Sequence, residues 1–157
     1  MTIDKIIFNP ACRATTLAGK PILLCVSNIL CDIGLEDFCN INTVGTKMLV
    51  GAGPHLNTLK ETFPDVIYPG DKQGEKLARY FATADILVYP HRNLDNIEII
   101  LEAIACGTPV AAYDLEMLFD VLSLGLNGEV ADTLEIAIDK CLRLDRILVS
   151  ESSQRFL

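Results

Sequence analysis

The chain has 157 residues, a length typical of a single domain that can bury its own hydrophobic core. Its formal net charge is −8, and its 13 Lys and Arg residues are spread thinly, which argues against a surface for nucleic acid or anionic membranes. Hydrophobic residues make up 50% of the chain, so we expect another domain or a partner to cover part of its apolar surface.

The six cysteines give no indication of a metal or redox site. They form no C-x-x-C pair and have no neighbouring histidine; they are Cys12, Cys25, Cys31, Cys39, Cys106 and Cys141. We therefore expect buried free thiols, no metal and no cofactor. The N-terminus lacks a basic segment followed by a long apolar core, and no apolar run approaches the roughly 20 residues of a spanning helix. These features predict a cytoplasmic protein without a transmembrane segment.

Short apolar runs alternate with helical patterns along most of the chain. Residues 1–20 have no sustained period and contain Pro10 and Gly19, so they are predicted to form a linker. The predicted strands are 22–26, 47–50, 66–68, 86–89 and 110–113. The predicted helices are 35–40, 54–63, 72–83, 97–106, 115–122 and 133–144. This alternation indicates a parallel sheet with helices on both faces, an α/β Rossmann-like doubly wound fold over residues 21–149.

Two helix starts carry local signals. Pro54 stands in the first turn of its helix, where the missing N–H costs nothing. Asp132 is the expected N-cap of the last helix. Residues 150–157 are predicted to be a C-terminal tail.

The most informative segment is 85–113. The apolar run 86–89 leads through a polar loop at 93–96 into the helix 97–106, which ends at Gly107. The amino end of a helix that faces a loop favours anions, because its N–H groups are unpaired and its dipole is positive there. Glu102 lies in the same otherwise apolar helix, where an unpaired carboxylate is costly. Either a ligand hydroxyl or a protein donor is therefore expected to bind it.

This segment, with Leu101-Glu102-Ala103 and Ala105-Cys106-Gly107-Thr108-Pro109, resembles the donor-binding core of retaining glycosyltransferases of family 4, the glycosyl transferases group 1 enzymes of GT-B fold. Five further blocks occur in the family's order. They are 8–10, similar to the end of its interdomain linker; 21–38, similar to its first strand and helix; 47–54, similar to its strand followed by Val-Gly-x-Gly-Pro; 70–85, similar to its helix before Ala-Asp; and Asn127-Gly128, similar to its late turn.

The resemblance implies one half of a GT-B enzyme, the C-terminal half. Its function would be to bind a nucleotide-diphosphate sugar for hexosyl transfer with retention, without a metal. An N-terminal acceptor-binding domain or a partner chain would supply the other half.

The resemblance also implies roles for single residues. Glu102 would hold the ribose hydroxyls, and Asn96, Ile97 and Glu98 at the helix start would face the phosphates. The loops with Gly51 and Gly53 and with Pro69 and Gly70 would contact base and ribose. Arg92 matches an arginine found in a subgroup of the family, and Asp95 is the one catalytic candidate. From the residues alone, Gly51 and Gly53 fit a tight turn equally well, and a plain turn is the favoured interpretation of Pro69-Gly70.

Three positions depart from the family pattern. The carboxylate that retaining members place eight residues before the helix glutamate is Leu94 here, and Asp95 replaces it only if the loop shifts by one residue. The Arg and Lys that neutralise the diphosphate are Asn28 and Ile33, and we expect no nearby positive charge to replace them. Loss of one preorganised contact of this kind costs about 3 kcal/mol of transition-state stabilisation. Two alternatives therefore stay open: a degenerate, non-catalytic binding or interaction module, and half of a sugar-nucleotide epimerase.

Overall fold

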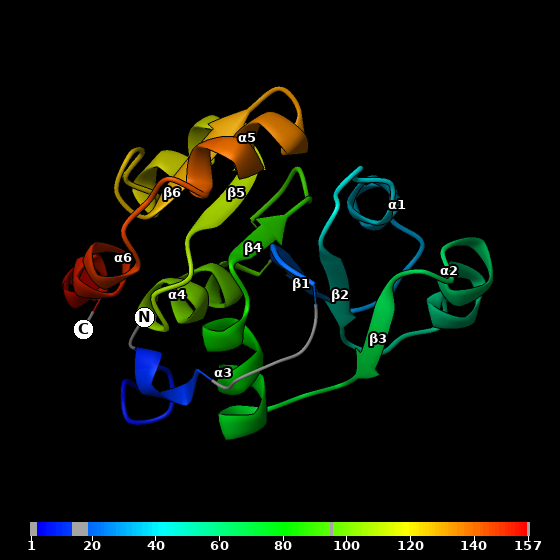
Figure 1. Cartoon of the computed structure of the whole chain (residues 1–157), viewed down its shortest axis with the longest axis horizontal. Coiled ribbons are helices and arrows are strands. Elements are labelled where there is room, and N and C mark those ends of the chain that lie inside the picture. Colours follow the sequence, from blue (N-terminus) through cyan, green and yellow to red (C-terminus); the bar gives the residue numbers. More distant parts are fainter. Residues whose placement is uncertain (1–2, 14–18, 95, 157) are drawn as a thin grey trace.

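The computed structural model describes residues 3–13, 19–94 and 96–156. Within them, six parallel strands form one sheet in the order β3-β2-β1-β4-β5-β6 (Figure 1). The strands are β1 (Ile22–Val26), β2 (Thr46–Val50), β3 (Ile67–Gly70), β4 (Ile86–Tyr89), β5 (Val110–Tyr113) and β6 (Gly128–Ala131). The Rossmann-like doubly wound fold expected from the alternating pattern is confirmed, because this strand order places the reversal of the winding between β1 and β4.

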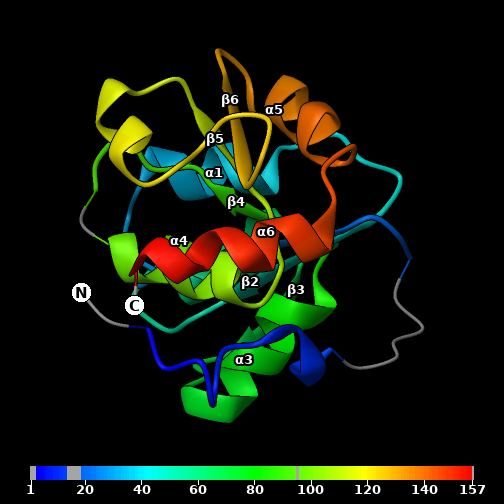
Figure 2. The ribbon, with the colours of Figure 1, turned by 90° about the vertical axis from the view of Figure 1, so that its left-hand side faces the viewer.

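Helices cover both faces of the sheet (Figures 1 and 2). One layer consists of α1 (Ile33–Cys39), α2 (Leu56–Thr62) and α5 (Leu134–Cys141), and the other of α3 (Gly74–Thr83), α4 (Ile97–Ala105) and α6 (Arg146–Ser152). Successive residues of a strand point to opposite faces, so Leu23 packs in the first layer and Leu24 in the second. Both are fully buried. The strands are therefore apolar on both sides, as buried parallel strands require.

The sequence prediction missed one strand, β6. Its residues are Gly-Glu-Val-Ala, and a four-residue run that begins with glycine has little strand propensity of its own. Tertiary contact explains the strand: β6 pairs with β5 from Val110 to Tyr113, and a Cβ at Gly128 would lie 2.7 Å from the Val110 carbonyl oxygen. The Asn127-Gly128 turn thus leads directly into a sheet strand.

Several helix predictions also need correction. Residues 115–122 hold a 3₁₀ helix, Glu116–Asp120, in place of an α-helix, and Thr133 caps α5 through its side chain in place of Asp132. Helix α6 was missed, although Asp145 gives a usual N-cap signal, accepting hydrogen bonds from the N–H groups of Ile147 and Leu148. The region expected to be a tail continues from α6 into a 3₁₀ helix, Ser153–Phe156.

The N-terminal segment lies against α3 (Figure 2). It contains a short 3₁₀ helix, Pro10–Cys12, and the buried side chains of Ile3 and Phe8. The Phe8 ring meets the Phe81 ring of α3 edge to face, with centroids 6.1 Å apart. This segment therefore contributes Ile3 and Phe8 to the packed core of the domain. Within the described residues, no helix has the length and apolar character that a membrane crossing requires.

Candidate functional site

A cavity of about 170 Å³ opens at the carboxyl edge of the sheet. Its walls come from the segments that follow β1, β2 and β3 and from the first turns of α4, which follows β4. The lining residues are Val26, Ser27, Asn28, Gly51, Asp71, Lys72, Gln73, Leu77, Asn96, Glu98, Ile99 and Glu102. The cavity thus lies beside the β1–β4 boundary, where open α/β sheets bind their ligands.

Glu102 is the most distinctive group on this wall. It is half-buried on α4, whose neighbouring residues Leu101 and Ala103 are buried. Among the described residues, no hydrogen-bond donor or cation is paired with its carboxylate. Burial, and then the neighbouring Glu98 carboxylate, raise the pKa of Glu102 to about 7. The Glu102 carboxylate therefore has its full hydrogen-bonding capacity free for a ligand, because no described protein group is paired with it.

Lys72 faces the same cavity from the loop between β3 and α3. The expectation that no positive charge would compensate for Asn28 and Ile33 is therefore wrong. Lys72 is distant from both in sequence, but β3 and β1 end at the same edge of the sheet, so their following loops meet. The cavity thus holds one cation and the amino end of α4, with its positive dipole, together with the carboxylates of Asp71, Glu98 and Glu102.

Gly51 is required by close packing at the end of β2. Its φ is +145°, and a Cβ there would lie 1.8 Å from the carbonyl oxygen of Ser27. Its N–H donates to the Gly70 carbonyl at 3.1 Å. The glycine thus lets the segments after β1 and β2 approach each other and the end of β3, beside the cavity that Gly51 lines. Gly53 has a similar steric reason, because a Cβ would lie 2.3 Å from the Ile29 carbonyl oxygen.

Comparison with known proteins connects this site to a family. Residues 21–144 match the family described as glycosyl transferases group 1. The chain belongs to that family. A GDP-mannose-dependent alpha-mannosyltransferase of Corynebacterium glutamicum is 28% identical over 142 residues, which cover 85% of this chain and 34% of that protein. The chain therefore spans about a third of the length of this relative.

Solved structures agree on the fold. Anabaena HepE, in complex with UDP and glucose, matches with a TM-score of 0.71 and 14% identity, over 99% of this chain and 51% of that chain. Sucrose-phosphate synthase from Thermosynechococcus elongatus matches with a TM-score of 0.70 and 22% identity, over 98% of this chain and 44% of that chain. The domain has the fold of the C-terminal half of a GT-B glycosyltransferase.

The structure brings together part of the residue set that the group 1 resemblance implied. Gly51, Asn96, Glu98 and Glu102 line the cavity. Ser27, Asp71, Lys72 and Gln73 line it as well, although none of them was a predicted site residue. Their positions after β1 and β3 were the available signal, since residues after parallel strands converge at one edge.

Other predicted residues lie outside the cavity lining. Pro69 and Gly70 were expected in a loop but form the end of β3, and Gly53 packs on Ile29. Ile97 packs against the core, and Asp95 lies outside the described residues. Arg92 places its guanidinium carbon 4.0 Å from the centre of the Tyr113 ring, so it stacks on the end of β5.

The three departures from the group 1 pattern have different surroundings. Asn28 lines the cavity, where the family's basic side chain would neutralise phosphate. Ile33 starts α1 and is 78% exposed. Leu94 packs against the hydrophobic core and brings no charge to the site. Within the described stretches, no group of three or more His, Cys, Asp or Glu residues is placed to hold a metal ion.

A histidine and an aspartate connect two loops at this edge. His91 follows β4, and its Nδ1 lies 2.9 Å from Oδ2 of Asp32, the N-cap of α1. The other carboxylate oxygen of Asp32 accepts the Gly34 N–H at 2.7 Å. The pair holds the segment after β1 against the segment after β4, which are the two sides of the winding reversal. Sequence reasoning did not find it, because its members are far apart in the chain.

Proposed function

We propose that this domain binds the nucleotide-diphosphate sugar donor of a group 1 glycosyltransferase for hexosyl transfer with retention. The unpaired, half-buried carboxylate of Glu102 in a cavity at the β1–β4 boundary carries this proposal. Because the chain spans about a third of its mannosyltransferase relative, transfer itself needs further protein. That protein is an N-terminal acceptor-binding domain or a partner chain.

The cavity, at about 170 Å³, holds only part of a nucleotide diphosphate, but its walls offer groups suited to the ribose and the phosphates. Ionised Glu102 accepts hydrogen bonds from ribose hydroxyls, and these bonds offset the free-energy cost of burying its charge. The start of α4 and the Lys72 ammonium provide positive potential for the diphosphate. The confined space around Gly51 brings backbone groups within reach of the ribose or base. Each of these groups acts without a metal ion.

The first test is a thermal-shift titration of the purified chain with UDP, GDP, ADP and their hexose conjugates. A ligand at 100 times its Kd adds about 2.7 kcal/mol to the free energy of unfolding, which is easily measured. We expect stabilisation by one nucleotide, and loss of that stabilisation in Glu102→Gln. Glu61→Gln is the matched control, since Glu61 is exposed on α2 and outside the cavity.

A second pair of variants tests the phosphate site. Lys72→Gln should weaken binding of the nucleoside diphosphate about tenfold and leave binding of the nucleoside unchanged, because it removes a charge that meets only phosphate. Lys76→Gln, at an exposed position of α3, should have no effect. A folded sample that responds to none of the nucleotides would refute the proposal. The degenerate interaction module would then be the better description of this domain.

A further inference from the structure

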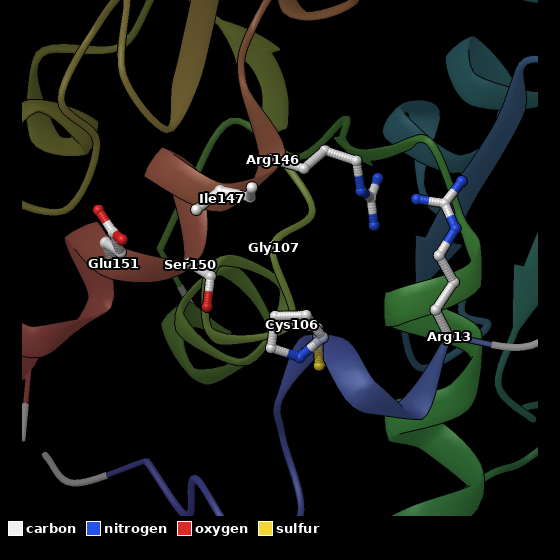
Figure 3. A pocket seen from close by; sticks show the side chains of 8 residues that line it. Arg13, Cys106, Gly107, Arg146, Ile147, Ser150 and Glu151 are labelled. Carbon is white, nitrogen blue, oxygen red and sulfur yellow. The ribbon is translucent and has the colours of Figure 1, made fainter.

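A second cavity, shown in Figure 3, lies at the amino edge of the sheet. It has a volume of about 310 Å³ and is enclosed by the C-terminal end of α4, the helix α6 and the N-terminal segment. Gly107, on its wall, connects α4 to the amino end of β5. Ligands that bind the carboxyl edge of the sheet therefore have no contact with this cavity.

Positive charge is concentrated at one end of this cavity. The guanidinium groups of Arg13 and Arg146 point toward each other (Figure 3), and both reach Asp85. Arg13 lies 3.7 Å and Lys20 lies 3.5 Å from the same Asp85 carboxylate oxygen, while Arg146 donates to the Asp85 carbonyl. Two cations thus share one carboxylate, and a third binds the backbone of the same residue, in a chain whose net charge is −8.

The two arginines differ in their free hydrogen-bonding capacity. Arg146 is engaged by protein: it donates to the carbonyls of Ala82, Ala84 and Asp85 and to the Thr108 hydroxyl. Arg13 has, within the described part of the chain, only the long contact to Asp85, and its side chain is 40% exposed. Arg13 therefore presents a guanidinium fork of the kind that binds a carboxylate with two parallel hydrogen bonds.

Most of the wall between the arginines and Glu151 is apolar. Pro10 and Ile147 contribute hydrocarbon, and burial raises the pKa of the Cys106 thiol to about 12, so the thiol is neutral. The Ser150 hydroxyl is already used, because it donates to the Ala105 carbonyl. The acidic side chain of Glu151 lies at the far end of the cavity from the two arginines (Figure 3). A ligand that fits must therefore combine one anionic end with a hydrocarbon body.

We propose that this cavity binds a short-chain alkyl carboxylate, with the carboxylate on Arg13 and the alkyl chain along Pro10, Cys106 and Ile147. A single free guanidinium fork matches one carboxylate, and Arg146 adds positive potential behind it. At the volume of roughly 30 Å³ that a water-sized group takes in a liquid, the cavity holds a ligand of about ten non-hydrogen atoms. Octanoate has this size, and a Kd on the order of 1 mM is expected for such a ligand.

The experiment uses octanoate with the purified chain, followed by thermal shift and by backbone amide NMR. Octanoate at ten times its Kd should raise Tm by about 3 to 5 °C and shift the amide signals of Cys106 and Gly107. Octanamide, which lacks the charge, and acetate, which lacks the chain, should each bind at least about tenfold more weakly.

Two variants test the two halves of the ligand. Arg13→Gln and Ile147→Gln should each weaken octanoate about tenfold or more, and both are expected to fold, because Arg13 is part-exposed and Ile147 is 69% exposed. Arg79→Gln, at an exposed position of α3, is the control for loss of a positive charge and should bind as the parent does.

Three results would overturn the proposal. The first is no response to octanoate at 20 mM, which is roughly twenty times the expected Kd; the second is an equal response to octanamide; the third is an unchanged affinity for octanoate in Arg13→Gln. The outcome is separate from that of the donor site. UDP or GDP binding should be unaffected by Arg13→Gln, and octanoate binding should be unaffected by Glu102→Gln, since the two cavities share no lining residue.

Discussion

At the scale of single residues, Glu102 combines a structural cost with a ligand-binding opportunity. It lies on a helix whose other residues largely face the core, and the neighbouring Glu98 adds repulsion. The sequence already indicated that an acid in this apolar helix needs a partner. The structure adds that the protein supplies none among the described residues and that a cavity lies in front of it. The proposed donor site would account for a residue that folding alone would disfavour.

Glu102→Gln should change how stability depends on pH. The pKa of Glu102 is about 7 in the folded domain, above its ordinary value of 4.5, so the folded state binds more protons than the unfolded state between these pH values. Stability from this group therefore falls as pH rises from 4.5 to 7. The loss is about 1 to 2 kcal/mol, after allowance for solvent screening of a half-buried group.

Urea denaturation of the parent chain and of Glu102→Gln at pH 4.5 and pH 8 measures this difference. The variant should gain stability relative to the parent at pH 8, and Glu61→Gln should not. Parallel behaviour of the parent and Glu102→Gln at both pH values would show that the carboxylate is well solvated.

At the scale of elements, the end of α3 depends on a side chain from a distant helix. The last carbonyls of a helix have no partner within it, and Arg146, the first residue of α6, binds those of Ala82 and Ala84. The same guanidinium binds the Thr108 hydroxyl just before β5. One side chain therefore joins α3, α6 and the start of β5, and burial lowers the pKa of Arg146 to about 10.

Arg146→Met should lower the free energy of unfolding by about 2 to 4 kcal/mol, because it leaves several carbonyl groups without a donor. Arg146→Lys should recover part of this loss, since an ammonium cannot reproduce the planar fork. Arg143→Met is the control, because Arg143 is exposed between α5 and α6. Equal stability of Arg146→Met and Arg143→Met in urea would show that water satisfies these carbonyls equally well.

At the scale of the whole molecule, the described N-terminal residues pack with the sheet domain. Ile3 and Phe8 are buried in the layer formed by α3, α4 and α6, and the Phe8 ring meets Phe81. This segment was expected to be a linker because it has no periodic pattern. A segment without regular structure can still contribute to a core through isolated apolar side chains, and single positions give no periodic signal.

Phe8→Ala should therefore destabilise the entire domain by about 3 kcal/mol, as expected for truncation of a buried aromatic residue. Ile6→Ala should have almost no effect, since Ile6 is 91% exposed. Tryptophan is absent from the chain, so circular dichroism during urea unfolding is a suitable probe. A loss below about 0.5 kcal/mol in Phe8→Ala would indicate that the segment is energetically separate from the domain.

The amino-acid sequence by itself determined the α/β class, five of the strands, and the strand-loop-helix segment with Glu102. Each of these depends on signals between near neighbours in the chain, such as apolar periodicity and turn residues. Only the tertiary structure decided which charges meet: it placed Lys72 in the cavity with Glu102, turned Arg92 onto Tyr113, and set His91 against Asp32. The physical reason is that strand order and helix packing bring distant segments together, and strand β6 likewise exists through its pairing with β5.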